Sequence, residues 1–236
     1  MSSKAAGRFM QALRSDHAGL SRVLREIDLQ QVLLQSETET ARAVLAEAMR
    51  YLLVYQHSVH HPREDRLFAR IRGRQPGLYR NMSRLVREHR SGQRQAEALA
   101  RELARATPAQ LRGRRGQLLA KQLQQYVRHT REHMKREEAV FYSGSERVLK
   151  PSDWAALMAG AEQRDPAGDL QRLAARYPRL AARLQQPERL ITEAGSGARP
   201  RREALRRCAE RVVEFYARLA HGTLDRARSV TQTLRR

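Results

Sequence analysis

The stretch YLLVYQHSVHHPREDRLF, residues 51–68, decides the fold, because it places histidine and glutamate on the apolar stripe of an amphipathic helix. His60 and Glu64 are four residues apart, so they lie one turn apart on one face of that helix. The stripe consists of Met49, Leu53, His57, His60, Glu64, Leu67 and Ile71. The face that should be buried therefore carries polar side chains.

Pro62 falls inside this predicted helix, two residues after His60. Proline lacks a backbone N–H, and its ring crowds the preceding turn, so it removes one hydrogen bond and kinks a helix. We therefore expect an irregular turn close to His60 and His61.

Three further stretches repeat the amphipathic pattern and again carry histidine among apolar residues. Their stripes are Leu13, His17, Leu20, Leu24 and Ile27; Met82, Leu85, His89, Gly92, Ala96, Leu99 and Leu103; and Leu119, Leu123, Tyr126, His133, Glu137 and Val140, with His129 at the edge of the last. Short breaks separate the stretches: SETET (36–40), GRQPG (73–77) and ATPAQLRG (106–113). The pattern predicts an all-α chain, folded as an antiparallel up-down four-helix bundle with additional C-terminal helices.

Two domains are expected along the chain. Residues 1–145 form the bundle, and residues 146–236 form a helical extension that packs on the bundle or mediates association. Within the extension, an amphipathic helix from 201 to about 233 needs a partner for its apolar face. A homodimer formed through this helix is one way to cover that face.

The predicted turns bring the polar residues of the stripes to one level. In an antiparallel pair of helices, two residues lie at the same height when they are equally far from the connecting turn. His17 and His60 are centred on the first break. Glu64 and His89 are centred on the second, and His89 and His133 on the third. All four helices therefore present polar side chains at the same height.

A histidine on an apolar stripe is by itself usually a core residue, but the whole set points to metal. Two buried carboxylates cost several kcal/mol each unless a cation pairs them, and no Lys or Arg lies on the four stripes. Cys208 is the only cysteine, which excludes a thiolate cage. Six nitrogen and oxygen donors exceed the needs of one tetrahedral zinc. The candidate ligands are His17, His60, Glu64, His89, His133 and Glu137.

Four phrases of the sequence resemble the hemerythrin-like, HHE cation-binding family: SDHAGL (15–20), YLLVYQHSVHHPREDRLF (51–68), EHR (88–90) and HMKREEAVF (133–141). The resemblance implies two iron ions joined by an oxo or hydroxo bridge, with manganese or zinc ranked behind iron. It makes Glu64 and Glu137 the bridging carboxylates, each paired with the histidine four residues before it. It assigns the lone histidines of the first and third helices to His17 and His89.

The sequence also departs from that family. Ser15 stands where many bacterial members have a histidine, and Gln93 stands where oxygen carriers have a second histidine on the third helix. Three other histidines could take part. His57 and His129 are equally open to a role as ligand or as hydrogen-bond partner of a ligand. His61 projects about 100° away from His60, so we expect it to face solvent or a neighbouring helix.

Composition limits the remaining function classes. The charge of +21 is spread along the chain rather than gathered in a basic arm, so nucleic acid is ranked last among the partners. No apolar run approaches the roughly 20 residues that span a bilayer, and the N-terminus lacks the apolar stretch of a signal peptide. We expect a cytoplasmic protein that does not insert into membranes.

Three functions fit these observations. The first is a di-iron protein that binds or senses O2, NO or iron itself. The second is a di-iron enzyme that decomposes peroxide or acts as an oxidase. The third is an interaction protein with a structural metal and a basic surface that binds nucleic acid.

Overall fold

The computed structural model describes residues 2–159 and 172–185 of the chain. These residues form helices and short connections without any strand, which confirms the predicted all-α class for the described part. Within the same part, no helix combines the length and the apolar character needed to cross a bilayer. The described residues belong to one compact unit, which ends at Gln185.

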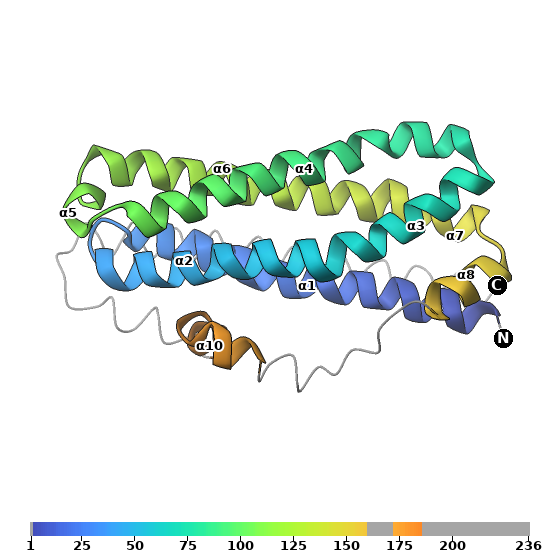
Figure 1. The fold of residues 1–236 in the computed structure, drawn as a ribbon, viewed down its shortest axis with the longest axis horizontal. Helices are drawn as coiled ribbons and strands as arrows, with labels where there is room; N and C mark the ends of the chain where they lie inside the picture. The colour runs from blue at the N-terminus through green and yellow to red at the C-terminus, as the bar shows by residue number, and fades with distance from the viewer. Residues whose placement is uncertain (1, 160–171, 186–236) are drawn as a thin grey trace, which may run out of the picture. The chain divides into compact units, whose positions relative to one another are not determined.

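Four long helical segments run beside one another (Figure 1). They are α1 (Ser2–Leu33); α2 (Thr38–Tyr55) continued by the π-helix η1 (Gln56–His60) and α3 (His61–Arg74); α4 (Pro76–Arg105); and α6 (Arg114–Arg136) continued by the π-helix η2 (Glu137–Tyr142) and α7 (Ser143–Val148). Shorter helices are α5 (Pro108–Leu111), α8 (Pro151–Ala159), a turn of helix at 172–176, and α10 (Pro178–Gln185). The segments meet in pairs, because α1 packs on α2 and α6 while α4 packs on α2, α3 and α6.

The predicted stripes of α1 and α4 lie in the core, each against neighbouring helices. Every apolar residue predicted on the first stripe is buried, and so is every apolar side chain predicted on the third. Burial of large aliphatic side chains is the main favourable term in folding. The three-and-four spacing thus identified the inner face of these two uninterrupted helices correctly.

The two π-helices change the inner face of the other two segments. A π-turn contains one residue more than an α-turn, so the side chains that follow it rotate around the helix. Val140, predicted to be buried, is 48% exposed, and Phe141 and Tyr142 point inward instead. In the same way His57 is exposed, whereas Tyr55 and His60, five residues apart, are both buried. The irregular turn expected near Pro62 is η1, which ends two residues before that proline.

Helix α8 packs on one end of the long helices. Trp154 and Leu157 are buried in the cluster that contains Phe9 and Phe68. The rings of Phe9 and Trp154 lie 6.1 Å apart between centroids. Asp153 accepts a hydrogen bond from Arg74 Nε at 2.9 Å, which ties α8 to the end of α3. The first helix of the C-terminal extension therefore completes the core.

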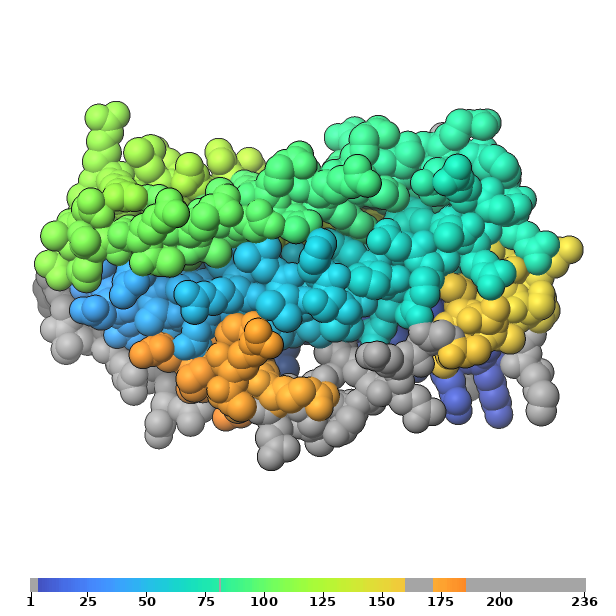
Figure 2. Space-filling view, viewed as in Figure 1, coloured from blue at the N-terminus to red at the C-terminus, as the bar shows by residue number. Residues whose placement is uncertain are grey.

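Helix α10 packs against α2, as Figure 2 shows in orange. Leu180 is fully buried, and its backbone N–H donates to Glu47 Oε2 at 2.9 Å. A carboxylate at a helix N-terminus pairs with otherwise unsatisfied N–H groups there. Arg22 donates to the backbone carbonyl of Leu184 at 2.8 Å from α1. The helix predicted from 201 to 233 lies outside the described residues.

Candidate metal centre

The six candidate ligands come from all four long segments and meet near their middle. His17 lies on α1, and His89 lies on α4. His60 ends η1, and Glu137 begins η2, so both π-helices border the site. The remaining two are Glu64 on α3 and His133 on α6. π-turns occur often at functional sites, where the extra residue changes the direction of a side chain.

One group of donors comes from α1, η1, α3 and η2. It consists of His17, His60, Glu64 and Glu137, whose ligand atoms lie within 4.8 Å of one another. The Nε2 atoms of His17 and His60 are 3.2 Å apart. His17 Nε2 lies 3.4 Å from Glu137 Oε2, and His60 Nε2 lies 3.6 Å from Glu64 Oε2. All four residues are buried.

A second group lies beside α4 and α6. His89, His133 and Glu137 again place their ligand atoms within 4.8 Å of one another. Glu137 Oε1 is 2.8 Å from His133 Nε2 and 3.1 Å from His89 Nε2. An overlapping group joins His61, Glu64 and His89, with His89 Nε2 3.4 Å from Glu64 Oε2. Glu64 and Glu137 therefore have donors on both sides.

Carboxylates contact the outer ring nitrogen of three of these histidines. His17 Nδ1 lies 2.8 Å from Glu138 Oε1, and His133 Nδ1 lies 2.9 Å from Glu88 Oε2. His60 Nδ1 lies 3.5 Å from Asp16 Oδ2, a longer contact. A carboxylate at Nδ1 fixes the ring orientation and leaves Nε2 as the metal-binding atom.

Sequence reasoning did not single out these carboxylates, although each is next to a candidate ligand in the chain. Asp16 precedes His17, Glu88 precedes His89, and Glu138 follows Glu137. An acidic residue directly beside a buried histidine or glutamate was the available signal. Which ligand it would contact depended on the packing of the helices.

Asp16 forms the centre of a buried polar cluster. It accepts hydrogen bonds from the Tyr55 hydroxyl at 2.7 Å and from Arg63 Nη1 at 2.8 Å. Arg63 is only 7% exposed, so a buried cation exists that the stripe analysis did not identify. Arg63 pairs with Asp16 and not with Glu64 or Glu137 among the described residues. This arginine therefore does not balance the negative charges of Glu64 and Glu137, which still require a cation.

Tyr142, which the sequence did not reveal as part of the site, covers the first group. Its hydroxyl donates to Glu64 Oε1 at 3.0 Å and lies 3.1 Å from His17 Nε2. Its ring stacks on His17 with the centroids 5.4 Å apart. Burial, together with the negative charge of Glu64, raises the pKa of Tyr142, so its hydroxyl keeps its proton in the metal-free protein. The π-turn of η2 brings this residue inward.

Burial and close charges move the pKa values of the central groups in opposite directions. Burial raises the pKa of Glu64 well above its usual value, and the charge of Glu137 adds to the rise. Burial also acts on Glu137, but close contacts with His133, His17 and His89 outweigh it and hold its pKa well below the usual value. Burial opposes protonation of His17, yet its close contacts with Glu137 and Glu138 raise its pKa to about 9. Without a metal, protons must supply the positive charge that this centre needs.

The donor set fits a metal cation. Glu64 Oε2 and Glu137 Oε2 are buried and have no hydrogen-bond partner among the described residues. Leaving a buried carboxylate oxygen unpaired costs free energy that coordination would recover. Neutral imidazole nitrogens and carboxylate oxygens suit iron, zinc and manganese. Glu137 Oε2 lies 3.4 Å from His17 Nε2, and Glu64 Oε2 lies 3.6 Å from His60 Nε2 and 3.4 Å from His89 Nε2.

Comparison with known families supports the same assignment. Residues 8–148 match the family model of the hemerythrin HHE cation binding domain. The chain belongs to this family. No curated protein and no solved structure gives a significant match. The matched HHE domain contains all three donor groups, so this part of the chain is a metal-ion-binding domain.

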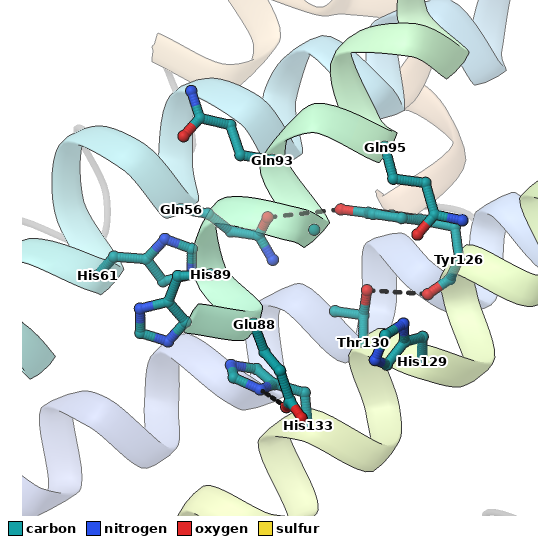
Figure 3. Close-up of a pocket in the computed structure, with 11 residues that line it drawn as sticks. Gln56, His61, Glu88, His89, Gln93, Gln95, Tyr126, His129, Thr130 and His133 are labelled. Carbon is teal, nitrogen blue, oxygen red and sulfur yellow. Dashed lines mark hydrogen bonds and ion pairs between the residues drawn. The ribbon is translucent and has the colours of Figure 1, made fainter. Parts of the chain in front are cut away.

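The three remaining histidines of the HHE domain take different positions. His61 stacks on His89, with ring centroids 3.9 Å apart, so it faces the neighbouring helix α4. Burial, together with the nearby histidines, lowers the pKa of His61 to about 2, which keeps its ring neutral. His129 is exposed and lines a pocket beside His133 (Figure 3). His57 is exposed and belongs to none of the donor groups within the described residues.

Proposed function

We propose that the HHE domain holds two iron ions bridged by the carboxylates of Glu64 and Glu137. His17 and His60 would bind the first ion, and His89 and His133 the second. The observation that supports this most is the sharing of both glutamates between donor groups on opposite sides. A single ion would leave one set of imidazole nitrogens without a partner. Manganese and zinc rank behind iron, as the sequence resemblance implies.

The protein residues around the proposed iron pair have defined tasks. Glu138 and Glu88 accept the Nδ1 protons of His17 and His133, which directs both Nε2 atoms inward. Tyr142 holds a proton between its hydroxyl and Glu64 Oε1, which restrains that carboxylate. When bound, the iron pair would supply redox chemistry and coordination positions for a small ligand.

We infer that the protein binds or senses a small molecule, O2 or NO, or iron itself. The buried ligand set supports this inference, because the long helices enclose the centre and exclude large substrates. A peroxide-decomposing or oxidase activity is the second candidate. Gln93 favours it, since its amide bonds Glu97 at 2.9 Å and it supplies no imidazole to the second ion. Fewer nitrogen ligands leave more positions for exchange.

For the arrangement of the helices, the cellular location of the protein and its binding partners, we propose what the sequence predicts. Short connections and pairwise packing support an antiparallel up-down bundle. A cytoplasmic location and a homodimer through the helix at 201–233 stay predictions. A structural metal with a nucleic-acid-binding surface ranks last, because its support is the net charge of +21 alone.

Iron content and optical spectra of the purified full chain test this proposal. We expect two irons per chain and near-ultraviolet bands of a bridged ferric pair that change when azide is added. Reduced protein exposed to O2 or NO should change its spectrum if it is a sensor. Steady peroxide consumption, lost in His133→Ala and Glu137→Ala, would favour the enzyme instead. Protein that takes up fewer than two irons under iron-replete conditions would contradict the di-iron assignment.

A further inference from the structure

Three tyrosines form a line of contacts that begins at the candidate metal centre. Tyr55 lies at the end of α2, its ring is buried, and its hydroxyl donates to Asp16 Oδ1 at 2.7 Å. The other carboxylate oxygen of Asp16 lies 3.5 Å from Nδ1 of His60, one of the candidate ligands. A single carboxylate therefore joins the Tyr55 hydroxyl to the centre.

The line continues outward through two more tyrosine rings. Tyr51 comes one turn before Tyr55 on α2 and stacks on it, with ring centroids 5.3 Å apart and an angle of 19° between the planes. The ring of Tyr177 meets Tyr51 edge to face, with centroids 5.8 Å apart. Tyr177 lies directly before α10, so the line leaves α2 and ends beside another helix. Each tyrosine touches the next.

The outer part of the line reaches the surface of the protein. Tyr51 is half-buried, and Tyr177 is 7% exposed. The residues on either side of Tyr177 in the chain, Arg176 and Pro178, are both exposed. Figure 2 shows this segment in orange on the outside of the molecule, where α10 packs on α2. A small molecule in solvent can therefore come close to the Tyr177 ring.

The other buried tyrosines near the centre do not lead to the surface. Tyr142 contacts the rings of His17 and Phe141. Neither Tyr142 nor Tyr126 touches another tyrosine within residues 2–159 and 172–185. Because phenylalanine and imidazole rings are harder to oxidise than a phenol, an electron passes more readily along a row of tyrosines. In the described part of the chain, Tyr55 begins such a row.

The surface around the outer tyrosines is basic. Arg50 precedes Tyr51 and Arg176 precedes Tyr177, and both arginines are exposed. Neither has an ion-pair partner among the residues that the structure describes. Uncompensated positive charge raises the local concentration of small anions. This surface therefore favours an anionic molecule over a neutral or cationic one.

We propose that Tyr55, Tyr51 and Tyr177 carry electrons from an anionic one-electron donor in solvent, such as ascorbate, to the metal centre while it reduces hydrogen peroxide. The inference rests on the proposed iron pair and on its second candidate activity, the consumption of peroxide. It adds the route of the electrons and the chemical class of a second substrate.

The electrons and protons of this reaction balance. Reduction of one hydrogen peroxide molecule breaks the O–O bond and forms two waters, which takes up two electrons and two protons from solvent. Each electron leaves the Tyr55 ring, and the phenol proton shifts along the hydrogen bond toward Asp16 Oδ1. Tyr51 reduces Tyr55, and Tyr177 reduces Tyr51, so each inner phenol regains its proton and Tyr177 releases one to solvent. Two ascorbate anions, one for each electron, then return a hydrogen atom to the Tyr177 oxygen.

Tyr51→Phe interrupts this path with little change in packing. It removes the oxidisable phenol but keeps the ring that lies between Tyr55 and Tyr177. Tyr79→Phe is the matched control, because Tyr79 is half-buried on α4 and its ring contacts the guanidinium of Arg72. Both variants should fold and hold as much iron as the wild-type protein.

Radical trapping in the iron-loaded full chain shows where the electrons come from. The protein is mixed with hydrogen peroxide, followed by electron paramagnetic resonance, and treated with a nitroso spin trap whose adducts are located by peptide mass spectrometry. We expect a tyrosyl radical that is trapped at Tyr177 in the wild-type protein and in Tyr79→Phe, and this adduct should be lost in Tyr51→Phe. An adduct at Tyr177 that persists in Tyr51→Phe, or radicals confined to Tyr142 or Tyr126, would overturn the path.

The donor is tested by the dependence of peroxide consumption on added reductant. Ascorbate should accelerate consumption in the wild-type protein and not in Tyr51→Phe or Tyr177→Phe. Arg176→Glu should raise the KM for ascorbate and leave the KM for the neutral donor hydroquinone unchanged. Equal changes for both donors, or none for ascorbate, would overturn the anionic class of the donor.

The iron content separates this inference from the proposed function. Protein that holds two irons but forms no tyrosyl radical with peroxide would overturn the tyrosine path and leave the iron pair in place. A chain that binds no iron under iron-replete conditions would contradict both.

Discussion

The two sides of the candidate metal centre use the same donor types but have different surroundings. We call the side with His17 and His60 the closed end, and the side with His89 and His133, which line a small pocket, the open end. At the closed end, Tyr142 and the buried Asp16 pack against histidines that are almost inaccessible. At the open end, the carboxylate that supports His133 is Glu88, which also pairs with surface arginines, and a pocket reaches the histidines. The histidines of the two ends therefore differ in how accessible they are.

The largest expected effect comes from the residue that both ends share. Glu137→Ala removes a donor from the first and the second group at once. We expect the iron content of the purified protein to fall by about tenfold or more, because both positions lose a charged ligand. His133→Ala should spare the closed end, whose four donors do not include His133, and retain about one iron.

The control for this prediction is Glu132→Gln, which changes an exposed carboxylate on the same segment. It should keep the wild-type iron content when measured by elemental analysis. Two irons per chain in Glu137→Ala would show that the shared glutamate does not bridge the ends.

The next effect compares the carboxylates that support the histidines. Asp16→Asn breaks a buried pair with Arg63 at the closed end, and losing one partner of such a pair costs about 3–5 kcal/mol. Glu88→Gln at the open end changes a carboxylate whose partner Arg136 is 39% exposed, and it should cost about 1 kcal/mol or less. Urea unfolding of the metal-free variants measures both. Equal losses would contradict the difference between the ends.

Acid should remove the contribution of Asp16. Burial raises the pKa of Asp16, but contacts with His60, Tyr55 and Arg63 outweigh it and hold the pKa below the ordinary 3.8. A lowered carboxyl pKa stabilises the fold above the unfolded-state value, and this stability is lost as the pH falls through the folded-state value. The stability difference between wild type and Asp16→Asn should therefore be full at neutral pH and shrink below about pH 3.8. A difference that grows on acidification would disprove this.

The smallest effect concerns the two helical glycines. Gly19→Ala and Gly92→Ala each add a methyl group to open space in a helix. Each should raise the free energy of unfolding by about 0.5–1 kcal/mol, because alanine favours helix more than glycine does. Thermal unfolding should show similar gains at both positions. A loss at Gly92 alone would mean that the pocket at the open end is not free space.

The sequence predicted that the candidate ligands lie at one height in the bundle. In an antiparallel pair of helices, two residues equally far from the connecting turn lie beside each other. Residues equally far from each turn were expected to meet, and His17 lies beside His60 and Glu64 beside His89 in the structure. The all-α class and the buried faces of α1 and α4 followed from the spacing of apolar residues. These features depend on uninterrupted α-helical geometry, which a repeating sequence pattern reveals well.

The remaining features depend on departures from that geometry. The extra residue in η2 turned Val140 outward and brought Tyr142 to the centre, and no periodic rule locates such a turn. The pairing of Asp16 with Arg63 joins α1 to α3 and depends on how two helices pack. The difference between the open and closed ends arises from these contacts, so the ligand residues alone did not predict it.

The centre itself is examined most directly by Mössbauer spectroscopy of the full chain loaded with iron-57, combined with iron quantification. A di-iron centre bridged by Glu64 and Glu137 predicts two antiferromagnetically coupled irons per chain. The two irons should give different Mössbauer signals, because the residues around them differ. One isolated iron per chain, or two uncoupled irons, would contradict it.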